Sequence, residues 1–179
     1  MTEFYAYHVV TDRPMQVGQH IVFDEFHHSG VFSRVMEKLE IVREIYAFPE
    51  AYQGKVLEHH VSVALRELAM EEVRKGKYPR YPSRMSCLYV SEKLEDAVEW
   101  SRLFVEWGRP VLQIVKLKIL GNKFVGDANN CFAGTADYGE NMVLSEHYWR
   151  NDPNPEGVEP IREILADGDI EVTEIVMNI

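Results

Sequence analysis

Alternating apolar and polar positions predict several β-strands along this chain. The most regular case is Val111–Ile119, in which alternate apolar side chains share one face while Lys116 and Lys118 occupy the other. A strand with this pattern is half-buried, so its register is well specified. Further strands are predicted at Phe4–Val10, Gln16–Phe23, Cys87–Ser91 and Asp169–Met177.

Apolar residues at helical spacing predict helices between these strands. Residues 29–80 contain two such runs, which predict a helical pair inserted into a sheet-built domain, followed by an extended Pro-rich connector that carries Arg80 and Arg84. We interpret both arginines as solvated, with contact to an anion as the alternative. Shorter helices are predicted at Glu140–Trp149 and Glu159–Ala166. The pattern as a whole predicts an α+β fold.

The stretch from Cys87 to Trp107 combines a strand with a helix and several aromatic side chains. Ser91 is the predicted N-cap of that helix, so the strand runs into the helix without a loop. Tyr89 and Trp100 then border one crevice, which suits a flat, electron-poor ligand ring. The alternative is that Trp100 belongs to an ordinary core stripe, because apolar residues recur at helical spacing on that helix.

Composition limits the class of protein. The chain has 179 residues, of which 46% are hydrophobic, so a single domain spanning residues 1–179 is expected. Its net charge is −10 and its basic residues are interleaved with acidic ones, which disfavours a nucleic-acid partner. No apolar run approaches the roughly 20 residues of a membrane span, so we expect no membrane association and a cytoplasmic location.

Metal binding is not expected from the histidine and cysteine pattern. The adjacent pairs His27-His28 and His59-His60 do not share a helix face, and no ligand at a spacing of four residues completes a set. Cys87 and Cys131 are too far apart in the chain to form a zinc motif, so we expect two reduced thiols.

Several of these segments together resemble the ADP-ribosyltransferase-like superfamily. The resemblance rests on Tyr7-His8 in the first strand, on Leu88-Tyr89-Val90-Ser91 leading into an acid-rich helix with Trp100, and on the turn Phe124–Asn129. Their order and spacing look most like the small bacterial enzymes that ADP-ribosylate rifamycin antibiotics. The resemblance implies a split β-sheet fold with NAD bound in a cleft, here with a helical insertion at about residues 29–80.

The resemblance also implies roles for particular residues. His8 would hydrogen-bond a ribose hydroxyl of NAD, Tyr89 and Trp100 would sandwich the nicotinamide, and Ser91 matches the small hydroxyl residue of the second motif. Asp127 matches the position whose carboxylate stabilises the developing positive charge, with Glu140 and Glu146 as alternatives.

Three functions therefore stand as hypotheses. The first is an NAD-dependent ADP-ribosyltransferase that uses NAD as a substrate, releases nicotinamide and modifies an unidentified, small-molecule acceptor. The second is a catalytically inactive protein of the same fold that binds a nucleotide or a protein partner. The third, a related RNA phosphotransferase, is disfavoured by the acidic composition. The oligomeric state is left open by the sequence.

Overall fold

The computed structural model describes residues 1–24 and 26–179, which form an α+β protein with two compact units. The first unit, here called the sheet unit, comprises residues 1–27, 87–124 and 163–179. The second unit, called the helical unit, comprises residues 28–86 and 125–162. The sheet unit carries the long predicted strands, and the helical unit contains the helices of the predicted insertion together with a later segment of the chain.

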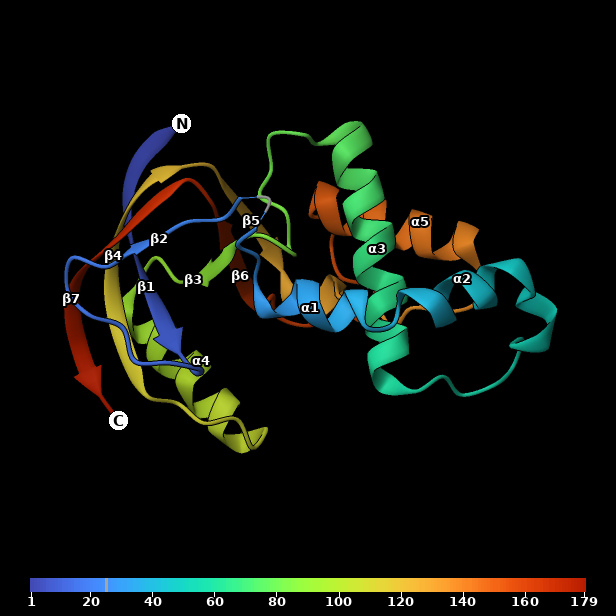
Figure 1. Cartoon of the computed structure of the whole chain (residues 1–179), viewed down its shortest axis with the longest axis horizontal. Coiled ribbons are helices and arrows are strands. Elements are labelled where there is room, and N and C mark those ends of the chain that lie inside the picture. Colours follow the sequence, from blue (N-terminus) through green and yellow to red (C-terminus); the bar gives the residue numbers. More distant parts are fainter. Residues whose placement is uncertain (25) are drawn as a thin grey trace. The chain divides into compact units, whose positions relative to one another are not determined.

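The larger sheet has the strand order β1-β4-β7-β2 (Figure 1) and its neighbouring strands are antiparallel. The pleat of the central strand places Val115, Leu117 and Ile119 on one face and both lysines on the other, as the alternation predicts. Ile114 shares the lysine face and is buried there in a cluster with residues of α4 (Leu94–Glu106). The register between β1 and β4 keeps the buried residues of both strands on the same face. In this register His8 lies opposite Val115 and Ala6 lies opposite Leu117. The strands are β1 (Thr2–Val10), β2 (His20–Ile21), β4 (Gln113–Gly121) and β7 (Asp169–Asn178).

A second, three-stranded sheet has the order β3-β6-β5 and comprises β3 (Leu88–Val90), β6 (Arg162–Ala166) and β5 (Lys123–Asp127). Helix α4 (Leu94–Glu106) packs on the larger sheet, where Ala97 and Ile114 belong to one buried cluster. The turns after β4 and after β6 approach each other closely at Gly121. A Cβ on that residue would lie 1.7 Å from the Asp167 carbonyl oxygen, so only glycine fits there.

The helical unit is built around α3 (His59–Lys77), which α5 (Tyr138–Arg150) and two shorter helices contact. The shorter helices are α1 (Gly30–Met36) and α2 (Leu39–Ala47), and two 3₁₀ turns, η1 (Pro49–Ala51) and η2 (Ala128–Asn130), complete the unit. Apolar side chains from α1, α2 and α3 form a buried cluster, which consists of Val35, Val42, Ile45, Val61, Ala64, Leu65 and Met85.

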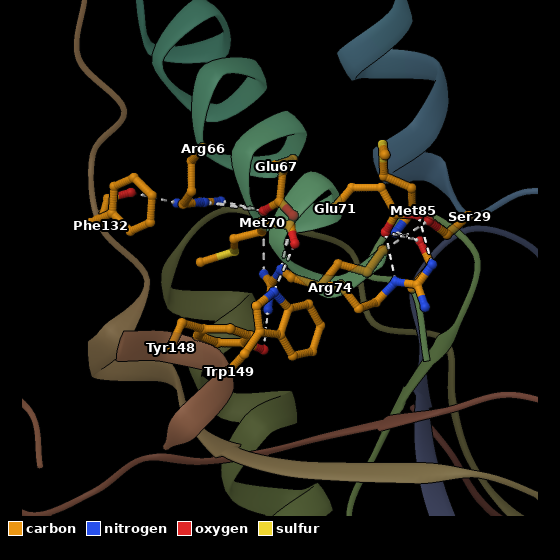
Figure 2. A network of polar contacts seen from close by, with 12 residues as sticks. Ser29, Arg66, Glu67, Met70, Glu71, Arg74, Met85, Phe132, Tyr148 and Trp149 are labelled. Atoms are coloured by element: carbon orange, nitrogen blue, oxygen red, sulfur yellow. Dashed lines mark hydrogen bonds and ion pairs between the residues drawn. The ribbon is translucent and has the colours of Figure 1, made fainter. Parts of the chain in front are cut away.

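A buried ion network fixes the connector after α3 to the rest of the helical unit. The Glu67 carboxylate, which is 1% exposed, accepts hydrogen bonds from Arg84 Nε at 2.8 Å and from Arg66 Nη2 at 2.8 Å. Arg84 also donates to the Tyr148 hydroxyl at 2.6 Å. Figure 2 shows this network, with Arg66 and Glu67 on α3 and Tyr148 on α5. Burial opposes ionisation of Glu67, but the two guanidinium groups hold the pKa of its carboxyl below the usual range.

A second acidic residue one helical turn further on ties down the same connector. The Glu71 carboxylate accepts two hydrogen bonds from Arg74 and one from the Ser83 hydroxyl, at 2.8 to 2.9 Å. The Arg74 guanidinium also donates to the Tyr81 carbonyl oxygen at 2.9 Å. The connector therefore has a fixed path although it forms no regular secondary structure over residues 78–86.

Three predicted elements differ from the structure. The helix predicted at Glu159–Ala166 is wrong, because residues 162–166 form strand β6. Its apolar residues fit a short buried strand as well as a helix, and pairing with β3 decides between them. The first helix of the pair predicted within residues 29–80 is divided into α1 and α2, since a break of two residues leaves the apolar spacing almost unchanged. The strand predicted at Gln16–Phe23 is reduced to the two residues of β2.

Two further predictions about single residues are wrong. Ser91 is not the N-cap of α4, which begins at Leu94 after Lys93, because the backbone of Ser91 is still extended and pairs with β1. Arg84 is not solvated but 5% exposed, because the burial of Glu67 requires a cationic partner.

The ion network predicts that Arg84→Met lowers the free energy of unfolding by about 3–5 kcal/mol, because it deprives a buried carboxylate of one partner. Urea unfolding checks this value. Arg102→Met is the matched control, since Arg102 pairs with Glu99 on the surface, and its cost is expected to stay within about 0.5 kcal/mol. Equal costs for the two substitutions would contradict a structural role for the buried network.

Candidate functional site

Strands β1 and β3 are tied edge to edge within the sheet unit. Each is the terminal strand of its own sheet, so each has an edge that no neighbouring strand of that sheet covers. Just beyond β3, the Ser91 N–H donates to the Tyr7 carbonyl and the Tyr7 N–H donates to the Ser91 carbonyl, both at 2.8 Å. This reciprocal pair closes both edges locally and joins the two sheets.

The imidazole of His8 makes a further link at this junction. Its Nδ1 lies 2.8 Å from the Tyr89 carbonyl oxygen, which only accepts hydrogen bonds, so Nδ1 carries the proton and Nε2 has a free lone pair. Burial lowers the pKa of His8 to about 4, and the hydrogen bond to Tyr89 offsets only part of this shift. The ring is therefore neutral at pH 7 and offers Nε2 as an acceptor.

The pairing of β3 with β6 points to a buried carboxylate near the same junction. Tyr89 lies opposite Leu165 and Val90 lies opposite Ile164, and continuing this register by one position would place Ser91 opposite Glu163. Directly opposite residues of an antiparallel pair share a face, with Cβ atoms about 4.5–5.5 Å apart. In that register Tyr89, Ser91 and Glu163 would share one face, and Glu163 is 9% exposed.

Trp100 lies in the sheet unit as well, on helix α4. It is half-buried and packs against the buried cluster that contains Val9 and Ile114. Its ring centroid is 5.7 Å from that of Phe104 and 6.3 Å from that of Trp107. These contacts show that Trp100 contributes to the core packing of α4. The sandwich with Tyr89 that the sequence suggests stays a prediction.

Asp127 belongs to the helical unit, where its carboxylate has a well-defined local role. One oxygen accepts from the backbone N–H groups of Asn129 at 2.9 Å and Ile161 at 3.0 Å, and the other accepts from Asn154 Nδ2 at 2.8 Å. Asp127 thus caps η2 and holds the returning chain, and the residue is 5% exposed. A carboxylate with these partners is suited to fixing a loop.

The two alternative carboxylates also lie in the helical unit. Glu140 accepts a hydrogen bond from the Thr135 hydroxyl at 2.9 Å. Glu146 pairs with Lys77 at 2.5 Å, and this hydrogen bond holds the pKa of Glu146 below its usual range. The structure therefore brings together His8, Tyr89 and Ser91 at one junction, whereas the three predicted carboxylates are found in the other unit.

Glu163 is the residue that sequence reasoning missed. It directly precedes the apolar run Ile164–Ala166, and the prediction of a helix at that point hid its relation to β3. Interpreting that run as a short buried strand would have placed an acid at the start of a strand. No group of three or more His, Cys, Asp or Glu side chains in residues 1–24 and 26–179 is arranged to hold a metal ion.

The fold and this junction define an α+β protein in which a four-stranded and a three-stranded sheet meet at the edges of β1 and β3. The chain belongs to the family described as "Protein of unknown function (DUF2441)", whose pattern matches residues 6–178 and so includes every residue of the junction. A comparison with curated proteins found no match. Among the described helices, none combines the length and apolar character needed to cross a bilayer.

The shifted pKa of His8 predicts a pH-dependent contribution to stability. Between about pH 6.5 and pH 4 the unfolded chain binds a proton that the folded protein excludes, so the free energy of unfolding falls as the pH falls. For a pKa lowered to about 4, the loss is about 3 kcal/mol.

The variant His8→Asn isolates this contribution, because Asn keeps an N–H donor for the Tyr89 carbonyl and does not titrate. In urea unfolding at about pH 7 and pH 4, we expect the variant to lose about 3 kcal/mol less than the wild type. The same pH dependence in both proteins would show that His8 is not held neutral.

Proposed function

We propose that this protein is an NAD-dependent ADP-ribosyltransferase-like enzyme that transfers ADP-ribose to a small-molecule acceptor and releases nicotinamide. The observation that carries the proposal is the junction of β1 and β3, where His8, Tyr89 and Ser91 are held together by hydrogen bonds of 2.8 Å. The finer fold assignment, an ADP-ribosyltransferase-like split sheet, belongs to the same proposal. The division into two sheets that meet at this junction supports it.

The protonation state of His8 supports a ribose hydroxyl as its partner. A neutral ring whose Nδ1–H is already used offers one acceptor, Nε2. An acceptor binds a hydroxyl donor, whereas a phosphate needs a donor or a cation. The geometry therefore favours the sugar of a nucleotide over its phosphates at this position.

The reaction proposed is a nucleophilic displacement at the anomeric carbon of the nicotinamide ribose. The bond between that carbon and the nicotinamide nitrogen breaks, and its electron pair neutralises the cationic ring as nicotinamide leaves. The acceptor's nucleophile forms the new bond and loses its proton. Aromatic faces such as those of Tyr89 and Trp100 attract the cationic ring before it leaves.

A carboxylate is needed where the sugar becomes positively charged. Asp127 is the predicted residue, but both of its oxygens already accept hydrogen bonds in the helical unit. We favour Glu163, because continuing the β3–β6 register by one position would put it beside Ser91 on the face that carries Tyr89. We therefore assign the stabilising role to Glu163 in this proposal and a structural role to Asp127.

A second candidate function is a nucleotide-binding module without catalysis. The hydrogen bonds of Asp127 favour this alternative. They give a structural role to the residue that matches the catalytic carboxylate in the resemblance. Both candidates share the nucleotide site and differ only in turnover. Cys87 and Cys131 are thiols and not a disulfide, which fits a reducing compartment, so we place either activity in the cytoplasm.

Nicotinamide release from NAD tests the proposal. We expect slow release by the wild type and a decrease on the order of 10²–10³-fold in Glu163→Gln, with NAD affinity nearly unchanged, because the carboxylate acts on charge that develops in the transition state. Asp127→Asn is the comparison variant. It is expected to cost about 1–3 kcal/mol of stability by placing a donor against backbone N–H groups, while its folded fraction keeps releasing nicotinamide.

The other outcomes separate the two candidate functions. If the protein binds NAD but releases no nicotinamide in the presence of a panel of small acceptors, the result would favour the binding module. Release by Glu163→Gln at the wild-type rate would remove Glu163 from the mechanism. A folded wild type that binds no NAD at millimolar concentration would contradict both candidate functions.

A further inference from the structure

The side chains of Tyr7 and Ser91 each bring a hydroxyl group to the junction. Within residues 1–24 and 26–179, neither the Ser91 hydroxyl nor the Tyr7 hydroxyl makes a hydrogen bond to another residue. Ser91 is only 6% exposed, and Tyr7 is half-buried against the cluster of Val9 and Ile114. Among the described residues, no fully buried side-chain oxygen or nitrogen lacks a hydrogen-bond partner, so both hydroxyls are reached by solvent and are available to a ligand.

The backbone pairing places these two side chains together. Tyr7 and Ser91 exchange both of their backbone hydrogen bonds, so they are directly opposite each other and their side chains share one face. Continuing the register of β3 with β6 by one position would add Glu163 to the same face. The junction therefore presents the side chains of Tyr7 and Ser91 on one face.

We infer that Tyr7 is a ligand-binding residue, whose hydroxyl, together with that of Ser91, binds the polar edge of a nicotinamide nucleoside. This inference rests on the proposed function and adds to it a residue that the superfamily resemblance does not assign. Two neighbouring hydroxyls match a ligand group that both donates and accepts, such as the ribose diol or the carboxamide. The phenol ring also contributes an apolar wall next to the cluster that contains Trp100.

The variant Tyr7→Phe tests this inference, because it removes the hydroxyl and keeps the ring. In calorimetric titrations with NAD, we expect the dissociation constant to rise about 5- to 10-fold, which corresponds to the loss of one hydrogen bond. Separate titrations with nicotinamide and with ADP-ribose show which half of the ligand the hydroxyl contacts. A loss of affinity in either titration supports the inference.

Tyr5→Phe is the matched control. Tyr5 lies two residues earlier on the same strand and face, but it is 52% exposed and precedes the junction. The dissociation constant of this variant for NAD should therefore equal that of the wild type. Tyr7→Phe with wild-type affinity for all three ligands would overturn the role of Tyr7 and leave the proposed function standing. A wild type that binds none of them would overturn both.

Discussion

The reciprocal backbone pair between Tyr7 and Ser91 is the interaction on which the sheet unit depends. Without it, β1 and β3 would each present an open edge, and open edges are sites of unwanted pairing. The pair also sets which residues become neighbours. It brings the His8 ring to the Tyr89 carbonyl and places the side chains of Tyr7 and Ser91 on one face. The candidate site is thus a direct consequence of how two sheet edges are closed.

The burial that shapes this junction also decides its chemistry. Burial keeps the imidazole of His8 neutral, and the Tyr89 carbonyl fixes which nitrogen carries the proton. Around this junction the protein presents the Nε2 acceptor of His8 on one face of β1 and the hydroxyls of Tyr7 and Ser91 on the other. This set suits the hydroxyls of a sugar, and it is less suited to a phosphate, which requires donors or positive charge.

The sequence predicted the parts of the structure in which local pattern and tertiary packing agree. The long strands β1, β4 and β7 were predicted close to their observed bounds, β4 from its clear alternation and β1 from its aromatic and β-branched residues. Strand β6 was missed because a short apolar run has no decisive period, and its state depends on pairing with β3. Arg84 was misjudged for a related reason. A charged residue in a Pro-rich connector is normally solvated, and the sequence does not show that the fold buries Glu67, from earlier in the chain, next to it. Likewise, the pairing of Ser91 with Tyr7 depends on register between distant segments, which composition and spacing do not encode.

The central claim is that NAD binds at the junction of β1 and β3, and backbone amide NMR with increasing NAD tests it most directly. We predict saturable shifts concentrated at residues 7–9 and 88–92, because the amides of Tyr7 and Ser91 hold the junction together next to the proposed ligand. Shifts confined to the helical unit, or none at millimolar NAD, would contradict the claim.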